Sequence, residues 1–463
     1  MFVPKIDDMT QKNLTQGGIM GNIATFSLPY MLAYFLQILY GLADLFVIGQ
    51  YCGVESTTAV SIGAQVMHML TVVIIGLAMG TTVHIARAVG ANNDKKTSIV
   101  IGNSVTIFFL LSVVLTALLL SLTDEIVSML DTPATAVDGT ESYLTICLAG
   151  IPFIVAYNVI ASVYRGLGDS KSPMYFVIVA CVVNIALDYL FIGYMGLGAS
   201  GAALGTTLSQ MASVIFALFA IKKGGSLLHI RRQDLRPQRK ISSDIFKIGV
   251  PVSLQDGFIQ VAFIAITIIA NGRGLNDAAA VGIVEKFIGL LFIVPSAMLA
   301  TVSTMSAQNI GAGKADRARS TLKYCTFIST GFGLVAAIVL QFIPQLAIRI
   351  FTDDAQVIVL GGEYLQGYSW DCALAGIHFC FSGFFTACGL SVISFCHNFL
   401  SIVCARVPLS YMASQMFPTT LLPMGLATSA GSLLSVVICI VVYIWMKRHG
   451  KFDYMFHLPD KSL

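Results

Sequence analysis

The chain has 463 residues, of which 56% are hydrophobic and only 11% are charged, and its formal net charge is +3 at pH 7. Soluble proteins carry about 25% charged residues, so this composition excludes a soluble globular domain and indicates a polytopic membrane protein. The apolar runs continue for about 20 residues, as membrane-spanning helices do. Strands of a membrane barrel instead alternate apolar and polar residues over about 10 positions.

Twelve apolar runs follow one another along the chain, and each is long enough for one spanning helix. Their approximate centres are Gln37, Leu70, Phe109, Pro152, Ile178, Met211, Phe263, Phe292, Phe332, Phe379, Ile402 and Val437. The longest polar segment is basic, contains Gly and Pro, and follows the sixth run. We therefore expect an all-α fold with a six-span N-lobe over residues 1–222, a cytoplasmic linker over 223–247 and a six-span C-lobe over 248–463.

Lysine and arginine concentrate in alternate loops, which predicts the orientation. If the N-terminus is inside, the outer loops contain Arg273 and Arg349, and two more basic residues, Lys286 and Arg406, fall within spans. That leaves 23 of the 27 basic residues in the inner loops. We expect a multi-pass protein of the bacterial inner membrane with both termini in the cytoplasm. A solvated loop at the inner membrane surface, in contact with anionic lipids, is sufficient to explain why the linker is basic. No nucleic-acid partner is therefore expected.

The two halves contain the same landmarks at nearly one separation. The pairs are Pro29 with Pro251 (222 residues apart), Gly90 with Gly311 (221) and Gly201 with Gly425 (224). This regularity indicates a duplication. Because each copy has an even number of spans, both copies enter the membrane in the same sense. A pseudo-two-fold axis along the membrane normal is therefore expected to relate them.

When the two halves are aligned on this repeat, several polar residues of the first half correspond to apolar residues of the second half. The matches are Asp44 with Ile266, Asn184 with Pro408, Asp188 with Met412, Thr206 with Ala430, and Asn158 with a position near Phe379. A duplicated fold that used these residues only for helix packing would tend to need them in both copies. We therefore expect a functional site confined to the first half.

Three of these oxygen-bearing side chains are expected at one depth. The first and fifth spans run outward with Asp44 and Asp188 in their outer thirds, and Thr206 begins the sixth, which runs inward. Asn184 lies one helical turn deeper on the same face as Asp188. Asn158 is expected nearer the inner side, so depth supports its membership less.

Oxygen atoms of Asp, Asn and Thr suit Na⁺ or a proton rather than a soft metal. Two facing carboxylates in a low dielectric cannot both stay ionised without a proton or a cation between them. Such a site can couple an ion gradient to a conformational change. Pro29 and Gly41 predict a bend in the first span that this change would use. The alternative is a buried polar cluster that only fixes helix packing.

The second half contains its own ionisable residues, namely Glu285, Lys286, Asp371 and Arg406. Glu285 and Lys286 are adjacent, so their side chains point about 100° apart and do not pair with each other. Together with Gln255, these residues either line a substrate cavity or form structural ion pairs.

The histidines His68, His84 and His378 are interpreted as isolated packing or hydrogen-bonding residues. The ten cysteines show neither paired spacing nor a zinc pattern. No metal site is therefore expected, apart from Na⁺ at the oxygen cluster of the first half.

Six motifs in order resemble the MATE (multidrug and toxic compound extrusion) transporters over essentially the whole chain. They are GLADLFVIGQY, ARAVGANNDKK, YRGLGDSKSP, NIALDYLFIGYMGLGASGAALGT, VPVSLQ and AQNIGAGKADRAR. The first-half cluster is most similar to the DinF-type branch. That resemblance implies a cation-coupling site of Asp44, Asp188, Asn184, Thr206, Asn158 and Tyr143, with Pro29 as the bend proline. The NorM-type branch has acids on its seventh and tenth spans, and whether the second half of this chain has a coupling site stays open.

The resemblance also implies the function, which is export of organic, usually cationic and amphipathic compounds in exchange for H⁺ or Na⁺ by alternating access. No other cofactor is expected, the partners are small molecules and membrane lipid, and the protein is expected to be a monomer and not an enzyme. A related flippase for lipid-linked oligosaccharide is the first alternative, although it would need more basic residues in its cavity. A membrane enzyme is the second, although the short outer loops contain no catalytic constellation.

Overall fold

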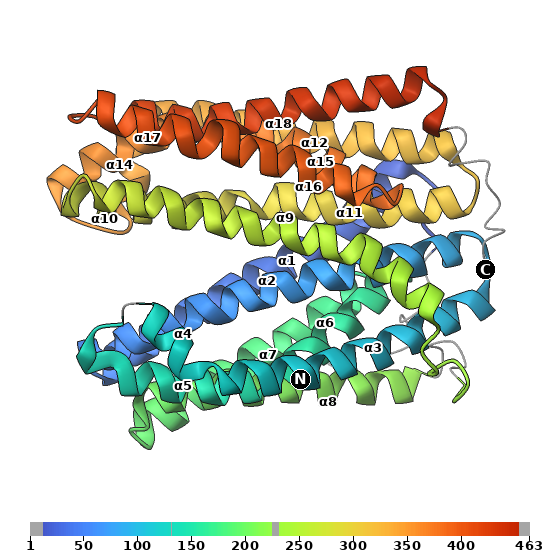
Figure 1. Ribbon diagram of the computed structural model, residues 1–463, viewed down its shortest axis with the longest axis horizontal. Coiled ribbons are helices and arrows are strands. Elements are labelled where there is room, and N and C mark those ends of the chain that lie inside the picture. Colours follow the sequence, from blue (N-terminus) through green and yellow to red (C-terminus); the bar gives the residue numbers. More distant parts are fainter. Residues whose placement is uncertain (1–12, 131, 225–230, 453–463) are drawn as a thin grey trace. The chain divides into compact units, whose positions relative to one another are not determined.

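The computed structural model describes residues 13–130, 132–224 and 231–452, and every regular element in them is helical (Figure 1). The chain divides into two compact units. Of the described residues, unit 1 comprises residue 13 and residues 28–249, and unit 2 comprises residues 14–27 and 250–452. The all-helical membrane fold that the composition predicts is confirmed.

The helices of the first half are listed in chain order with their bounds. They are α1 (Ile19–Tyr51), α2 (Val54–Gly90), α3 (Asp94–Ser121), α4 (Thr123–Met129), the 3-10 turn η2 (Ala134–Ala136), α5 (Val137–Ala149), α6 (Ile151–Gly166), α7 (Lys171–Asp188), the π-helix η3 (Tyr189–Tyr194) and α8 (Gly198–Gly224).

The second half follows a similar order. Its helices are α9 (Arg239–Asn271), α10 (Leu275–Leu291), α11 (Ile293–Gly311), α12 (Ala315–Phe342), α13 (Pro344–Arg349), α14 (Ala355–Tyr368), α15 (Trp370–Ala387), α16 (Ser391–Ser401), the π-helix η4 (Ile402–Arg406), α17 (Val407–Met416) and α18 (Leu422–Arg448).

Ten helical segments among the described residues are long and apolar enough to cross a membrane. The α5–α6 pair, bent by 48°, adds an eleventh if it is counted as one span. The remaining expected span, centred on Phe379, lies on α14 and α15. The break between these two helices, and the buried polar residues Asp371 and His378 on α15, make this span shorter and less apolar than the others.

The boundaries of the units differ from the predicted lobes in two short segments. Residues 14–27, expected in the N-lobe, belong to unit 2, and residues 239–249, the first turns of α9, belong to unit 1. The change of unit falls directly before Pro29 in α1 and directly before Pro251 in α9. Of the expected linker, residues 225–230 lie outside the described residues, and 239–247 are helical.

Close backbone approaches at glycines hold the helices of each unit together. In unit 2, a Cβ at Gly367 would overlap the carbonyl of Leu422, and a Cβ at Gly425 would overlap the carbonyl of Tyr364. These reciprocal contacts let α14 and α18 pack backbone to backbone, as small residues do between membrane helices. The requirement for close packing explains why a glycine stands at the repeat landmark 425.

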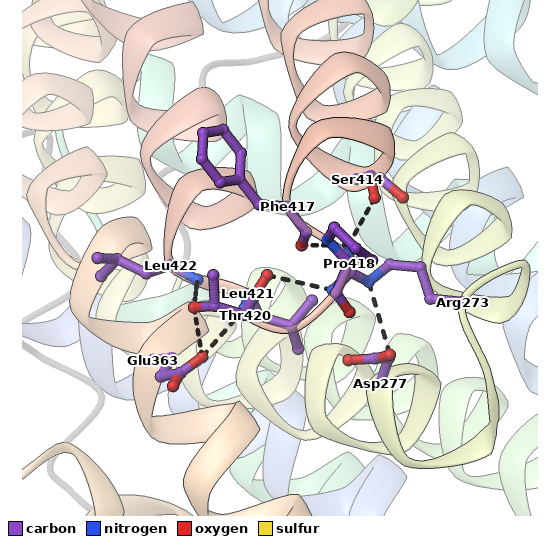
Figure 2. A network of polar contacts seen from close by, with 9 residues as sticks. All are labelled: Arg273, Asp277, Glu363, Ser414, Phe417, Pro418, Thr420, Leu421 and Leu422. Atoms are coloured by element: carbon purple, nitrogen blue, oxygen red, sulfur yellow. Dashed lines mark hydrogen bonds and ion pairs between the residues drawn. The ribbon is translucent and has the colours of Figure 1, made fainter.

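Arg273, one of the two basic residues in the predicted outer loops, has a structural role. Its guanidinium, at the end of α9, donates to the carbonyls of Ser414, Phe417, Pro418 and Thr420 at 2.8–3.1 Å, and its Nε lies 3.5 Å from Asp277 (Figure 2). Glu363 accepts bonds from the Thr420 hydroxyl (2.6 Å) and the Leu421 amide (3.1 Å). The two side chains therefore clamp the loop between α17 and α18 from both sides.

Replacing Arg273 with Lys is expected to destabilise the protein. A lysine ammonium cannot match the planar fork of five donors, so carbonyls of the loop lose their partners. We expect a loss of roughly 1–3 kcal/mol, seen as a lower thermal unfolding midpoint in detergent. Arg349→Lys, at an exposed residue of α13, serves as the control. Equal midpoints for the two variants would contradict the clamp.

Candidate functional site

The three polar residues that the sequence places at one depth, together with Asn184 one turn deeper, meet in unit 1. The Thr206 hydroxyl of α8 donates to Asp44 Oδ2 of α1 at 3.2 Å. The Asp188 carboxyl group and the Asn184 amide of α7 lie beside the same Asp44 carboxylate. Asp44 is 6% exposed, and Asp188 and Asn184 are fully buried. We refer to these four residues as the acid cluster.

Most polar atoms of the acid cluster have no hydrogen-bond partner. Within the described part of the chain, none is found for Asp44 Oδ1, both Asp188 oxygens, or Asn184 Oδ1 and Nδ2. Buried polar groups are nearly always paired, because an unpaired one costs about 1–3 kcal/mol. Two carboxylates side by side only accept hydrogen bonds, so a proton or a cation is the group that would satisfy them.

Local backbone features make room for Asp188. A Cβ at Gly205 of α8 would overlap Asp188 Oδ1, so only glycine lets the carboxylate approach this helix. Asp188 is also the last residue of α7 before the π-helix η3. Such wide turns are rare and frequently occur at functional sites.

The side of α1 that carries Asp44 is polar for several turns, which the sequence reasoning missed. Tyr40 lies next to Gln210 of α8, and Gln37 lies next to Tyr157 of α6. Residues 37, 40 and 44 are spaced as one helical face requires, and 206 and 210 are spaced in the same way on α8. This spacing of polar residues three and four positions apart was the sequence signal for a polar face on each helix.

Tyr143 and Asn158 are buried in unit 1 but have other recorded partners. The Tyr143 ring packs where a Cβ on Gly63 would lie, and its hydroxyl lies beside the Cys147 thiol. The Asn158 amide nitrogen donates to the Ile154 carbonyl of its own helix at 2.8 Å. Tyr143 also interacts electrostatically with Asp44 of the acid cluster, whereas the recorded contact of Asn158 does not join it to the cluster. Pro29 lies inside α1, at the point where that helix changes unit.

In unit 2, the structure supports the alternative of an ion pair for one of the cavity candidates. Asp371 of α15 is fully buried and accepts a 2.5 Å bond from Arg406 of η4, which also donates to Ser432 at 3.3 Å. Glu285 of α10 is half-buried and accepts a bond from Thr267 at 3.3 Å, while Lys286 is exposed.

Gln255 on α9 is 2% exposed. Its Oε1 has no partner among the described residues. Glu285 interacts electrostatically with Arg406, the partner of Asp371, whereas no recorded contact among the described residues joins Gln255 to this group.

The second half has a different register at α16–α17 from the predicted one. Gly168 and Gly389 both have positive φ (+89° and +79°) and lie 221 residues apart (389 − 168). With a separation of 221–222, Asn184 corresponds to 405–406 and Asp188 to 409–410, two to three positions before Pro408 and Met412. The second half has extra residues between this point and Gly425. A charged residue, Arg406, therefore stands where an apolar one was expected.

Comparisons with known proteins agree with the duplication. Residues 29–190 and 251–412 both match the MatE family model, and the two matches start 222 residues apart (251 − 29). The chain is 25% identical over 449 residues to "Probable multidrug resistance protein YoeA" of Bacillus subtilis, covering 95% of this chain and 97% of that one. It is 27% identical over 422 residues to YpnP of the same organism, covering 91% and 94%.

Solved structures show the same architecture. A structure of MATE in complex with MaL6 superposes with a TM-score of 0.87 at 24% identity, covering 94% of this chain and 97% of that chain. An outward-facing multidrug resistance MATE family transporter of the MOP superfamily gives a TM-score of 0.86 at 25% identity, with the same coverage.

Proposed function

Because the chain belongs to the MatE family, whose model it matches in both halves, we propose that it exports organic cations across the membrane in exchange for H⁺ or Na⁺ bound at the acid cluster. Antiport requires a site whose charge differs between the loaded and the empty state. The acid cluster meets this requirement, since binding a cation neutralises charge that is otherwise buried.

The observation that carries this proposal is the set of unpaired atoms on Asp44, Asp188 and Asn184. A cluster that only fixed helix packing would gain most if its hydrogen bonds were complete. Here Thr206 donates a single bond to Asp44, and the Asp44 and Asp188 carboxyl groups lie beside each other. Their unpaired acceptors are hard oxygens, as H⁺ and Na⁺ prefer.

Relatives support drug export. The matched proteins are described as probable multidrug resistance proteins and, in Staphylococcus, as the multidrug export protein MepA. Glu285, half-buried and with one oxygen unpaired within the described chain, is an acid that a cationic drug could neutralise. A flippase for lipid-linked oligosaccharide would need free basic side chains, whereas Arg406 is held by Asp371 and Arg165 donates to Ser162 and lies over Tyr30.

The unequal distribution of Lys and Arg between the inner and outer loops supports the predicted orientation. We infer a location in the bacterial inner membrane, surrounded by lipid, with both termini in the cytoplasm, because basic residues concentrate in the loops on that side. A monomer is part of the same proposal. The acid pair on the first and fifth spans supports assignment to the DinF-type branch.

The test is ethidium export by the purified full-length protein in liposomes, with proton and sodium gradients imposed separately. We expect one gradient to drive export and the other to have no effect. If neither gradient changes the export rate above that of protein-free liposomes, coupled antiport is wrong for this chain.

A further inference from the structure

Two buried imidazoles meet in unit 2, although the sequence was interpreted as placing His378 by itself. The His397 ring of α16 lies with Nε2 2.8 Å from the Ser382 hydroxyl of α15 and Nδ1 2.6 Å from the Ser435 hydroxyl of α18. The His378 ring of α15 is edge-on to it, with 5.9 Å between ring centroids. His397 is fully buried and His378 is 4% exposed.

Polar contacts continue from this pair toward the middle of the unit. Ser432 lies one helical turn before Ser435 on α18 and accepts a bond from Arg406 at 3.3 Å. Arg406 in turn donates to Asp371. Asp371 and His378 are seven residues apart on α15, so they lie on the same face two turns apart.

Polar contacts also continue in the opposite direction, toward the junction of α15 and α16. The Ser394 hydroxyl donates to the backbone carbonyl of Ser382 at 3.0 Å and lies 3.4 Å from the Thr386 hydroxyl. Arg406 stays charged and hands no proton on, so the side chains that can exchange protons succeed one another from Ser432 to Thr386. The steps between Ser432 and Ser435, and between Ser382 and Ser394, are the ones without a direct side-chain bond.

Unpaired atoms lie beside this row. His378 Nδ1 and Asp371 Oδ1 are buried and have no partner within the described residues. Water molecules fill such positions in polar interiors, because each can bond to several groups that are otherwise unsatisfied. A water bound to His378 Nδ1 would therefore be held by the residue that lies between Asp371 and His397.

Burying this row of polar side chains costs more free energy than packing the same helices with apolar side chains would. Apolar side chains of similar volume would fill the interior of a membrane helix bundle without any desolvation penalty, and intramembrane histidines are frequent in proton relays. Histidine is also the side chain that exchanges protons near neutral pH. The groups that face the two rings are each other, the Ser382 and Ser435 hydroxyls and, further along, Arg406 with its partner Asp371.

We propose that unit 2 contains a proton relay in which His397 passes protons between Ser435 and Ser382, linking the Ser432 end, beside the Asp371–Arg406 pair, to the Thr386 end of α15. A proton that reaches Nδ1 from the Ser435 hydroxyl forms an imidazolium, and the proton on Nε2 then leaves to the Ser382 oxygen. The Ser382 hydroxyl gives its own proton to a water molecule on the Ser394 side, and a water molecule on the Ser432 side replaces the proton that Ser435 gave up, so one proton leaves the row for each that enters it. The ring is left as the other neutral tautomer, and rotation of the hydroxyls resets it.

The relay goes beyond the proposed function, because the acid cluster lies in unit 1 and shares no residue with it. His397→Gln tests it, since a glutamine amide keeps a donor and an acceptor but cannot take up a proton. Ser401→Ala is the matched control. Ser401 is on the same helix, is also buried, and its hydroxyl bonds to the Gly431 carbonyl outside the row.

The measurement uses the full-length protein in liposomes that contain a pH-sensitive dye, with ethidium as the exported compound. We expect proton flux to fall at least about 10-fold in His397→Gln relative to Ser401→Ala, with equal ethidium binding and equal thermal midpoints. If His397→Gln does not fold, Ser435→Ala decides, because it removes only one hydroxyl and is expected to lower the flux as well.

Proton flux in the deciding variant equal to that of the control would overturn the relay. So would export by the unchanged protein that is driven by sodium and moves no protons, and that result would leave the proposed antiport intact. Absence of any gradient-driven ethidium export, together with dye-detected proton flux that depends on His397, would instead reject the antiport and retain the relay.

Discussion

Asp188→Asn abolishes gradient-driven export of ethidium while the protein remains folded. The change keeps the shape of the side chain and replaces a carboxylate that takes up a cation with an amide that does not. Asp188 is fully buried beside Asp44, so no other described acid replaces it in this cluster. We expect the export rate in liposomes to fall to that of protein-free liposomes. Asp44→Asn is expected to behave in the same way.

Asp124→Asn is the control for this prediction, because Asp124 is an exposed acid in the first turn of α4. It should export at the normal rate. Size-exclusion profiles and thermal midpoints of the three variants show whether the fold is intact. Export at half the normal rate or more by Asp188→Asn would rule out the acid cluster as the coupling site.

Gly205→Ala is expected to impair coupling without removing any charge. The added methyl group would occupy the place of Asp188 Oδ1, so the carboxylate must move away from Asp44 or α8 must shift. Displacements of about 1 Å at a reacting group can cost about 10²-fold in rate. We therefore expect coupled export to fall by roughly this factor in the liposome assay, while the thermal midpoint changes little.

Gly49→Ala provides the comparison, since a Cβ there has no heavy atom within 4 Å and Gly49 lies on α1 five residues after Asp44. An alanine at such a helical position is normally neutral or slightly stabilising. If both alanine variants export at the normal rate, the space at Gly205 is not required and the geometry of the acid cluster is more tolerant than its packing indicates.

Helix periodicity and depth were sufficient to predict that Asp44, Asp188, Asn184 and Thr206 lie together. Those two properties depend only on residue spacing and on the direction of each span. Asn158 was included from the repeat and Tyr143 through the resemblance alone; the recorded hydrogen bond of Asn158 stays within its own helix, while Tyr143 interacts electrostatically with Asp44. The sequence also did not reveal Tyr40 and Gln210, because their pairing depends on the rotation of α1 against α8.

The second half was harder to predict because its chemistry depends on tertiary contacts. Asp371 and Arg406 are 35 positions apart, and the π-helix η4 shifts the residues that follow Ser401 relative to a regular helix. His378 and His397 lie on successive helices, so no spacing rule brings them together. Ile266, the apolar residue that the repeat matches with Asp44, is fully buried in the core of unit 2. Shortening it to alanine would leave a cavity, so Ile266→Ala would itself destabilise the protein and cannot serve as a control for Asp44→Asn.

The exchange of leading segments between the units has a consequence for how such a protein could originate. Leu14 is buried in a core cluster of unit 2, while Ile241 and Ile245 are buried in the core of unit 1. Each core is therefore completed by a piece of chain that precedes the opposite half. A six-helix ancestor standing alone would lack that piece, and two copies that traded their first turns would be the smallest assembly able to supply it.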